Sequence, residues 1–485
     1  MITLHKPLEA ATMTKSIQLI IIPTPVVGHL VSFVQFADTL LRRDDRLSIS
    51  VLLINLPLFS DPVFTKKLSA SHPSINFIDL PPLDFSLRLA SPPMAPEAFI
   101  SSIIELHKPS VKAAVENLIL LPDDDRSSLR FVVDMFCTSM IDVARDFGAP
   151  CYTFFTSSAA FLGLLDFIST HHLHELTEAG PDSMMIPSYA SPVPASVLPH
   201  FVFLKDGCDA FAAHGRRIKE TDGVILNTFA DLEPHALASF AEGYPPLYPV
   251  GPILDLARAE QMSEARRAES ERILRWLDAQ EEESVVFLCF GSMGSFKADQ
   301  VAEIAAGLES TGVKFLWALR KRPQGIYDAP GEYEDPSEVL PEGFLARTEA
   351  RGLICGWAPQ VEILAHKSVG GFVTHCGWNS TLESIWFGVP TVAWPLYAEQ
   401  QINAFQMVKD LGLAIELKID YNIFKDALVP AAEIENAVRL LMAKDGYGLE
   451  IRKRVKDMSE RSRAAVAAGG SSFETIGALI NKMLN

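Results

Sequence analysis

Residues 357–400 bring together side chains that can stack on a ring, donate hydrogen bonds and accept them around one glycine-bearing turn. Within this window, GGFVTHCGWNSTLES has the pattern of a strand, a tight turn at 375–377 and a helix. Asn379 and Ser380 are residue types that cap helix N-termini. The N–H groups and partial positive charge of such an end bind phosphate, and His375 could add a hydrogen bond. An ordinary capped helix packed on a sheet would show the same pattern.

The rest of the window supplies partners for a larger ligand. Trp357 ends a predicted strand, where ligands of open α/β sheets gather, and its indole offers a flat face to a base. Gln360 and Glu383 are suitable partners for ribose hydroxyls. Glu399 and Gln400 follow another strand end at the same edge and suit neighbouring hydroxyls of a sugar. Base, ribose, phosphate and hexose would thus be bound in order along the window.

A histidine and an acid in the first half of the chain point to proton transfer. His29 follows the apolar run IIIP and stands beside Gly28 at the start of a helical pattern, a position that also fits a helix-capping or buried histidine. Asp134 is the only acid in FVVDMF, and burying it is costly unless it is paired. A functional role is therefore favoured for Asp134 over a surface one. A histidine base needs a partner that fixes its tautomer and stabilises the imidazolium.

Short β-branched or aromatic runs alternate with amphipathic helical patterns, which predicts parallel sheets covered by helices on both faces. The alternation stops in the polar stretch 248–270, which has no strand pattern and is interpreted as a linker, and then restarts. We therefore expect an α/β fold of two doubly wound, Rossmann-like domains facing a cleft. The expected strands are 18–22, 49–54, 131–136, 151–155, 223–229, 284–291, 314–320, 353–357, 370–375, 390–395 and 413–417. The expected segments are an N-terminal domain (1–252), a linker (253–270), a C-terminal domain (271–465) and a C-terminal helix (466–485) that packs back on the first domain.

The composition limits the classes of partner. The 485 residues are 48% hydrophobic and 21% charged, as in a globular protein of several domains. A net charge of -18 disfavours nucleic acid and anionic membranes as partners. No apolar run approaches the ~18 residues that span a membrane, and no secretory signal is evident, so we expect a cytoplasmic protein. Six cysteines without a CxxC pair indicate reduced thiols, and HHLH at 171–174 lacks the spacing of a zinc site, so no metal is expected.

The window at 357–400 resembles, almost residue for residue, the signature box of plant family 1 UDP-glycosyltransferases, and the resemblance extends over essentially the whole chain. It implies the two-domain GT-B fold and a UDP-sugar donor, with acceptor binding in the domain 1–252 and UDP-sugar binding in the domain 271–465. Uracil would stack on Trp357 and meet the backbone of Ala358, while Ser292 in FGSMGS would contact the phosphates. The donor-binding residues that the resemblance implies are Trp357, Ala358, Gln360, His375, Gly377, Trp378, Asn379, Ser380, Glu383, Glu399, Gln400, Ser292 and Thr156.

The resemblance also assigns the chemistry. His29 would be the general base and Asp134 its partner, in an inverting transfer of glucose to a hydroxyl of a small aromatic acceptor. Glucose is implied because Trp378 and Gln400 occupy the positions that go with that sugar in the family. Val26 stands where relatives often have glycine, which should alter the turn or the acceptor fit. The expected acceptor-binding residues are Gly28, Phe136, Phe155 and Tyr397.

A phenol is favoured as the acceptor because its pKa of about 10 makes it easier to deprotonate than an aliphatic alcohol. The apolar stretch 131–155 suits a flat flavonoid, stilbene or simple phenol, and the stretches 81–100 and 181–205 should decide among them. We expect no cofactor besides the co-substrate UDP-glucose, and a monomer.

The sequence also bears on three other functions. A nicotinamide-dependent oxidoreductase would need GxGxxG after a strand, and the sequence has no such fingerprint. A non-catalytic UDP-sugar-binding protein would be expected to lack His29 or Asp134, and both are present. A glycosyltransferase that uses another UDP-sugar stays open.

Overall fold

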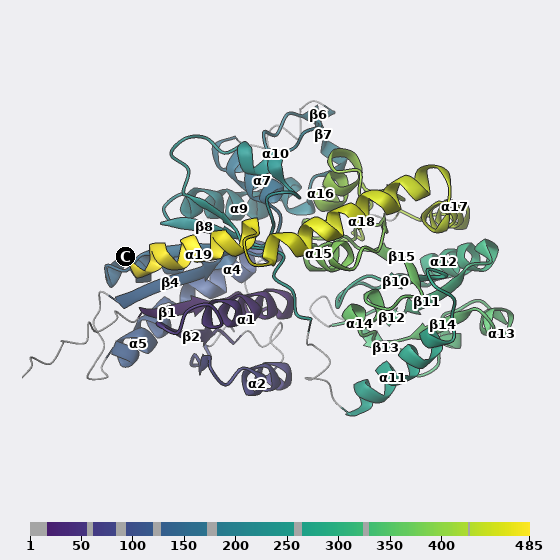
Figure 1. Cartoon of the computed structure of the whole chain (residues 1–485), viewed down its shortest axis with the longest axis horizontal. Coiled ribbons are helices and arrows are strands. Elements are labelled where there is room, and N and C mark those ends of the chain that lie inside the picture. Colours follow the sequence, from purple (N-terminus) through teal and green to yellow (C-terminus); the bar gives the residue numbers. More distant parts are fainter. Residues whose placement is uncertain are drawn as a thin grey trace, which may run out of the picture.

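The computed structural model of the protein describes residues 17–55, 62–83, 94–119, 128–171, 182–256, 264–323, 329–424 and 427–485. Two α/β lobes lie side by side, each built on one parallel sheet, with the first half of the chain on the left of Figure 1 and the second on the right. This architecture confirms the expected fold of two doubly wound domains. The N-terminal lobe holds the seven-stranded sheet, and the C-terminal lobe holds the six-stranded sheet.

The sheet of the N-terminal lobe is apolar along its strands because helices cover both of its faces. Its order is β3-β2-β1-β4-β5-β8-β9, and every pairing is parallel. The sequence pattern does not predict β3, since its residues NFID are exposed or half-buried at the sheet edge and form no apolar run. The strands are β1 (Ile17–Ile22), β2 (Leu47–Leu53), β3 (Asn76–Asp79), β4 (Leu129–Asp134), β5 (Cys151–Phe155), β8 (Gly223–Leu226) and β9 (Leu247–Pro249).

Two separate apolar cores cover this sheet. One core joins α1 (Val27–Leu41), α2 (Pro62–Ser71) and the last helix of the chain to one face. The other joins α4 (Pro96–Leu106), α5 (Lys108–Ile119) and α6 (Ile141–Asp146) to the opposite face. The remaining elements of the lobe are η2 (Met135–Met140), α7 (Ala159–Thr170), β6 (Ser183–Met184), β7 (Val193–Pro194), η3 (Ala195–Val197), η4 (His200–Phe203), α9 (Lys205–Ile218) and α10 (Pro234–Ala238).

The C-terminal lobe repeats the plan with the order β14-β11-β10-β15-β16-β17, again wholly parallel. Its strands are β10 (Val285–Cys289), β11 (Lys314–Ala318), β14 (Gly352–Cys355), β15 (Val369–Thr374), β16 (Thr391–Ala393) and β17 (Ala414–Glu416). Its helices are α11 (Glu264–Asp278), α12 (Ala298–Thr311), α13 (Phe344–Thr348), α14 (Gln360–Leu364), α15 (Trp378–Phe387), α16 (Gln400–Phe405), the π-helix η7 (Gln406–Asp410), α17 (Ala431–Met442) and α18 (Gly446–Val466). A small hairpin, β12 (Arg320–Lys321) and β13 (Gly331–Glu332), and η6 (Pro336–Glu338) complete the lobe.

Every expected strand range overlaps an observed strand, but several boundaries are wrong. β4 ends at Asp134, two residues early, because the Asp134 carboxylate accepts the N–H of Phe136 and starts η2. The stretch 248–270 does contain strand residues, since β9 pairs with β8 as the last strand of the first sheet. Its end is helical, because α11 begins at Glu264. Residues 257–263 of that stretch, 84–93 and 172–181 lie outside the described residues.

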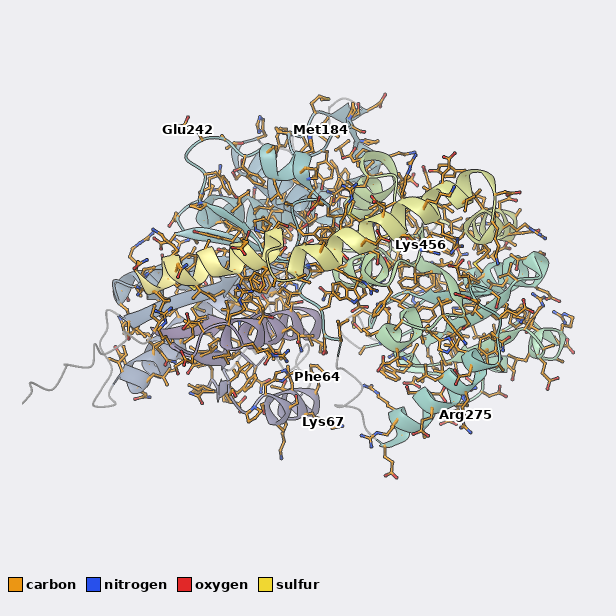
Figure 2. The ribbon with its side chains drawn as sticks, in the orientation of Figure 1. Phe64, Lys67, Met184, Glu242, Arg275 and Lys456 are labelled. Carbon is orange, nitrogen blue, oxygen red and sulfur yellow. The ribbon has the colours of Figure 1, made fainter. Side chains whose placement is uncertain are left out.

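The last two helices connect the lobes. In Figure 1, α18 lies on the C-terminal lobe, and α19 (Ser471–Leu484) crosses to the N-terminal lobe. Lys456, labelled on α18 in Figure 2, is 2.9 Å from a carboxylate oxygen of Glu283 in the C-terminal lobe. The apolar side of α19 joins the core around β1, and Nε of Arg130 in β4 donates to the carbonyl of Met483 at 2.7 Å. The end of the chain thus packs on the first sheet. Among the described residues, no helix is both long and apolar enough to cross a lipid bilayer.

Candidate active site

The amino ends of α1 and α15 meet between the lobes. Each helix follows the carboxyl end of a central strand, β1 or β15, which is where open α/β sheets bind ligands. Nδ2 of Asn379 donates to the carbonyl of Gly28 at 3.3 Å, and Oγ of Ser32 donates to Oδ1 of Asn379 at 3.4 Å. The turn before His29 and the turn after His375 therefore lie against each other.

His29 and Asp134 form a close pair. Nδ1 of His29 is 2.7 Å from Oδ2 of Asp134, whose side chain is fully buried, while the His29 side chain is 24% exposed. The other carboxylate oxygen of Asp134 accepts the hydroxyl of Thr24 at 2.6 Å and the N–H of Phe136 at 3.1 Å. Oγ1 of Thr156 is also 3.1 Å from Nδ1 of His29. Since Nδ1 faces these partners, Nε2 is the nitrogen left to accept a proton.

The pKa of His29 is raised above its ordinary value of 6.5. Burial lowers the pKa, but the charge of Asp134, its hydrogen bond and the charge of Glu399 together outweigh burial. A neighbouring carboxylate stabilises the imidazolium that forms when the ring takes a proton, which is the property of a general base.

Val26, which replaces the glycine common among relatives, sits at the N-cap of α1. Its backbone is extended, with φ of -118° and ψ of 133°, so the position needs no glycine. Gly28 in the first turn of α1 is exposed. The turn that presents His29 is thus compatible with the valine.

The amino end of α15 has no side-chain cap. The helix begins at Trp378, with Gly377 as its N-cap, and no side chain caps its first N–H groups. The expected capping role of Asn379 and Ser380 is therefore wrong, because both lie within the first turn. Uncapped N–H groups at a helix N-terminus are the donors that bind phosphate oxygens.

His375 lies between two glycines next to this helix end. A Cβ atom at Gly291 or at Gly377 would stand 2.6 Å from Nε2 of His375, so only glycine leaves room for the ring. Burial lowers the pKa of His375 to about 4, so the ring is neutral and keeps one N–H to donate. Ser292 follows Gly291 and is exposed. The first N–H groups of α15, the ring of His375 and Ser292 beside Gly291 are thus hydrogen-bond donors grouped at one helix end.

The residues expected to bind the uracil base and the ribose lie at the same edge of the C-terminal sheet as this helix end. Nε2 of Gln360 donates to Oε2 of Glu383 at 2.6 Å and to Oγ of Ser380 at 2.8 Å, which fixes the three side chains in one cluster. The ring of Trp357 is half-buried after β14, and the guanidinium of Arg266 lies over it at 5.2 Å. The half-buried Ala358 follows Trp357.

Glu399 and Gln400 stand at the start of α16 and face the N-terminal lobe. Oγ of Ser157 donates to Oε1 of Glu399 at 3.3 Å across the cleft. Oε1 of Gln400 accepts the N–H groups of Leu396 and Tyr397 at 2.9 and 3.1 Å, which orients the amide NH2 as its remaining donor. The turn that carries them is strained, because Ala398 has a φ of 54°. Strain of this kind is often found where side chains are held for a ligand.

Two expected contacts do not fit the structure. The indole of Trp378 is 3% exposed, and its Nε1 donates to the carbonyl of Asn227 at 2.7 Å, so the side chain holds the lobes together and offers a sugar at most its backbone. The side chain of Phe155 is fully buried against Phe161, which removes Phe155 from the acceptor-binding residues. Both errors arise because sequence position shows which strand end a residue occupies but not which way its side chain points.

Of the other expected acceptor-binding residues, Phe136 lies near His29. The rings of Phe136 and His29 are 5.9 Å apart, and Phe136 is half-buried. Tyr397 is half-buried too, and burial raises its pKa to about 12. Behind Phe136 lies His214, whose ring is perpendicular to it at 5.7 Å.

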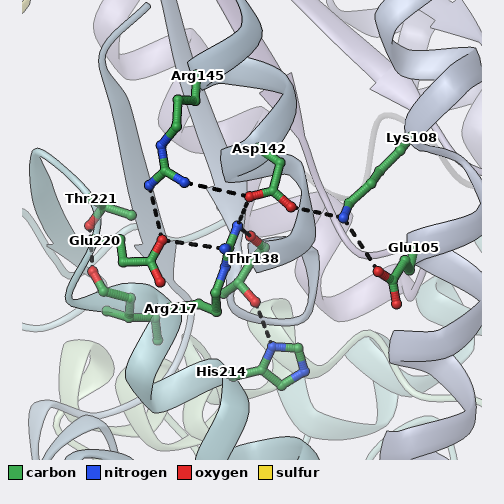
Figure 3. A network of polar contacts seen from close by, with 10 residues as sticks. Glu105, Lys108, Thr138, Asp142, Arg145, His214, Arg217, Glu220 and Thr221 are labelled. Atoms are coloured by element: carbon green, nitrogen blue, oxygen red, sulfur yellow. Dashed lines mark hydrogen bonds and ion pairs between the residues drawn. The ribbon is translucent and has the colours of Figure 1, made fainter.

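A network of hydrogen bonds and ion pairs around His214 was not predicted from the sequence (Figure 3). Nδ1 of His214 is 2.8 Å from the hydroxyl of Thr138. Its Nε2 is 2.8 Å from the hydroxyl of Ser101. Asp142 binds Arg217 and lies 2.8 Å from Nζ of Lys108. These contacts link α4, α5, α6 and α9 around η2, the segment that carries Phe136.

Sequence reasoning also missed Ser157, Asn227 and Glu233. Ser157 and Asn227 follow the ends of β5 and β8, and the rule that ligand-side residues follow strand ends could have drawn attention to them. Glu233 lies farther along the chain, at the N-cap of α10. All six cysteines are free thiols. Nowhere in the described ranges do three or more His, Cys, Asp or Glu side chains converge to hold a metal ion.

Two α/β lobes, an uncapped helix N-terminus in one and a His–Asp pair in the other are the features of a nucleotide-sugar transferase of the GT-B class. Residues 240–453 match the family described as UDP-glucoronosyl and UDP-glucosyl transferase. UDP-glycosyltransferase 71K2 of Pyrus communis is 46% identical over 97% of this chain and 98% of its own length. UDP-glucose flavonoid 3-O-glucosyltransferase 6 of Fragaria ananassa is 44% identical over 97% of this chain and 99% of its own.

Among solved structures, Medicago truncatula UGT71G1 complexed with UDP-glucose is similar, with a TM-score of 0.86 and 41% identity over 98% of this chain and 99% of that one. The protein belongs to the plant family 1 UDP-glycosyltransferases. It is therefore an enzyme that transfers a sugar from a UDP-sugar donor.

Proposed function

We propose that the protein transfers glucose from UDP-glucose to a hydroxyl of a small phenolic acceptor, with inversion at the sugar C1. The observation that carries the proposal is that the His29–Asp134 pair lies beside the amino end of α15, since Nδ2 of Asn379 donates to the carbonyl of Gly28, the neighbour of His29. The Medicago relative bound to UDP-glucose and the flavonoid activity named for the Fragaria relative support the choice of donor and acceptor class.

The proton would move to the nitrogen of His29 that faces away from Asp134. The acceptor O–H gives its proton to Nε2 as the oxygen attacks C1 and the bond from C1 to the diphosphate oxygen breaks. Asp134 holds Nδ1 and stabilises the imidazolium. A base on the lobe opposite the diphosphate site supports attack from the face opposite the leaving group, and so inversion.

UDP would leave against fixed dipoles. The uncapped N–H groups of α15, the neutral His375 and Ser292 are placed to stabilise the charge that develops on the phosphate. Gln360 and Glu383 would hold the ribose and Trp357 the base. Gln400 and Glu399 would hold the hexose, with Thr156 near C1 because it contacts the base His29. The orientation of Gln400 through its own backbone neighbours supports a preference for glucose over its epimers.

A panel of phenols and aliphatic alcohols, followed by mass spectrometry of the glucoside and by UDP release, tests the proposal. We expect phenolic glucosides from UDP-glucose and a collapse of turnover in His29→Ala with UDP-glucose binding retained. Binding of UDP-glucose without any glucoside would favour a non-catalytic binding protein. Unchanged glucoside formation in His29→Ala would remove the base assignment.

A further inference from the structure

A second pair of buried residues connects the lobes behind the sugar site. Glu233 is the N-cap of α10 in the N-terminal lobe, and Gln406 is the first residue of η7 in the C-terminal lobe. Their side chains are 1% and 3% exposed, and Nε2 of Gln406 donates to Oε1 of Glu233 at 2.8 Å. Buried carboxylates are costly unless fully hydrogen-bonded, so this pair has a specific structural task.

Glu233 also holds the start of α7. Its two carboxylate oxygens accept the N–H groups of Ala159 and Ala160 at 2.9 and 3.0 Å. Those residues follow directly on Thr156 and Ser157, the turn that contacts His29 and Glu399. The carboxylate therefore fixes the position of the turn beside the proposed base.

Gln406 holds the end of the element that carries the sugar-binding residues. Glu399 and Gln400 begin α16, and η7 continues it directly from Gln406. Figure 1 places α16 at the junction with the N-terminal lobe, next to α7 and α10. Asp410 at the end of η7 adds a second connection, since its carboxylate accepts the N–H groups of Ala190 and Ser191 at 3.0 Å each. Insertions that widen a helix to the π form are frequent at functional sites.

The turn at Thr156 and Ser157 and the segment formed by α16 and η7 are thus connected at two places. Ser157 binds Glu399 at the cleft, and Glu233 binds Gln406 deeper in the interface. We propose that Glu233 and Gln406 are positioning residues that hold the sugar-binding start of α16 in register with the turn beside His29, so that C1 of the bound sugar faces the acceptor oxygen rather than water. This inference rests on the proposed function, since it assigns the sugar to Glu399 and Gln400.

The neighbouring Gln401 provides a matched control. It is 1% exposed, lies in α16, and its Nε2 donates to the carbonyl of Tyr421 at 3.0 Å, wholly within the C-terminal lobe. Gln406→Leu and Gln401→Leu each remove one buried amide hydrogen bond from the same segment. A purely structural role predicts the same consequences for both variants.

We expect Gln406→Leu to lower kcat for glucosylation by about tenfold to a hundredfold, because small misplacements of reacting groups cost that much. The ratio of UDP released to glucoside formed should rise. The Kd of UDP should stay as in the natural protein, because UDP carries no sugar. Gln401→Leu should lower the melting temperature but leave the ratio of UDP release to glucoside unchanged. Equal ratios in the two variants would overturn the proposal.

Exchanging the pair tests the contact itself. Gln406→Glu places a second carboxylate against Glu233 and should lower kcat more than Gln406→Leu does. Adding Glu233→Gln to Gln406→Glu restores an amide-to-carboxylate hydrogen bond, but it also turns an amide NH2 toward the N–H of Ala159 or Ala160, so it should recover only part of the lost kcat. A double variant no better than Gln406→Glu alone would contradict a direct positioning contact.

One measurement is independent of the acceptor. The ratio of the Kd of UDP to the Kd of UDP-glucose reports what the sugar adds to binding, and it should fall in Gln406→Leu but not in Gln401→Leu. If the natural protein forms no phenolic glucoside, the proposed function fails while this ratio still tests the positioning role. If glucoside forms and the ratio is the same in both variants, only the positioning role fails.

Discussion

Nδ1 of His29 lies 2.7 Å from Oδ2 of Asp134, although 105 positions separate the two residues in the chain. The pairing follows from the sheet order, because β1 and β4 are parallel neighbours whose carboxyl ends meet at one edge. Thr24 and the N–H of Phe136 hold the carboxylate in place. The geometry leads to the predictions below.

Replacing Asp134 by Asn should lower kcat by on the order of a hundredfold or more, since the amide keeps the shape but loses the charge that stabilises the imidazolium. The Kd of UDP-glucose should not change. Thr24→Val is the control, because it removes a hydrogen bond from the same carboxylate but leaves its charge. If kcat falls as much in Thr24→Val as in Asp134→Asn, the charge of Asp134 does not contribute to catalysis.

The pH profile of kcat/KM should show the raised pKa of His29. The neutral ring is the active base, so the rate should rise with pH through a pKa above 6.5 and then level off. In Asp134→Asn the acidic limb should move to lower pH, because the largest effects that raise the pKa come from Asp134. An acidic limb at the same pH in both proteins would exclude His29 as the titrating group.

The same raised pKa affects stability. A group with a raised folded pKa stabilises the fold below its unfolded pKa of 6.5, and this contribution disappears as the pH rises through the folded value. The free energy of unfolding, measured in urea, includes this contribution at acidic pH but not at alkaline pH. His29→Gln should therefore lose more stability relative to the natural protein at acidic pH than at alkaline pH.

Gly291→Ala should weaken the binding of UDP. Gly291 has a φ of 76°, and a Cβ there would stand 2.6 Å from Nε2 of His375. Gly312→Ala is a matched control, since its φ is 69° but nothing lies within 4 Å of the added atom. Both variants should lose about 1 kcal/mol of stability from the left-handed backbone. Only Gly291→Ala should raise the Kd of UDP, by about tenfold or more, as measured by titration calorimetry. If the two variants bind UDP with the same Kd, His375 does not bind the diphosphate.

Gln400→Ala should reduce the preference for UDP-glucose over UDP-galactose in direct competition. The lost amide removes one hydrogen bond to the sugar, which corresponds to about a tenfold change in the ratio of kcat/KM values. Gln401→Ala removes a buried amide from the same helix but should keep the preference. If the two variants discriminate equally, Gln400 does not select the sugar.

Periodic apolar runs were enough to predict two parallel sheets, because a strand buried on both faces must be apolar throughout. They missed β3 and β9, which lie at the sheet edges and are short and partly exposed. They also placed the end of β4 too late, because the bond from Phe136 N–H to Asp134 that ends the strand depends on a side-chain orientation. The edge strands of a sheet and the ends of its strands depend on contacts that a local sequence pattern does not show.

The site was predictable to the level of residue types. The order of strand, turn and helix placed His375 and Gly377 beside a helix N-terminus, and the apolar surroundings of Asp134 indicated a partner. Side-chain direction was not predictable. Phe155 ends β5 and is fully buried, whereas Phe136 follows the end of β4, is half-buried and lies near the ring of His29. Alternate residues of a strand point to opposite faces, and the chain turns at each strand end.

The sequence by itself determined which residues stand at strand ends and helix starts, because hydrophobic period and turn residues act over a few positions. Only the tertiary structure decided which of those ends meet. Asp134 faces His29, Ser157 faces Glu399 and Glu233 faces Gln406 because sheet order and the docking of two lobes bring distant segments together. Such contacts between distant segments depend on the packing of the whole molecule, so no local pattern encodes them.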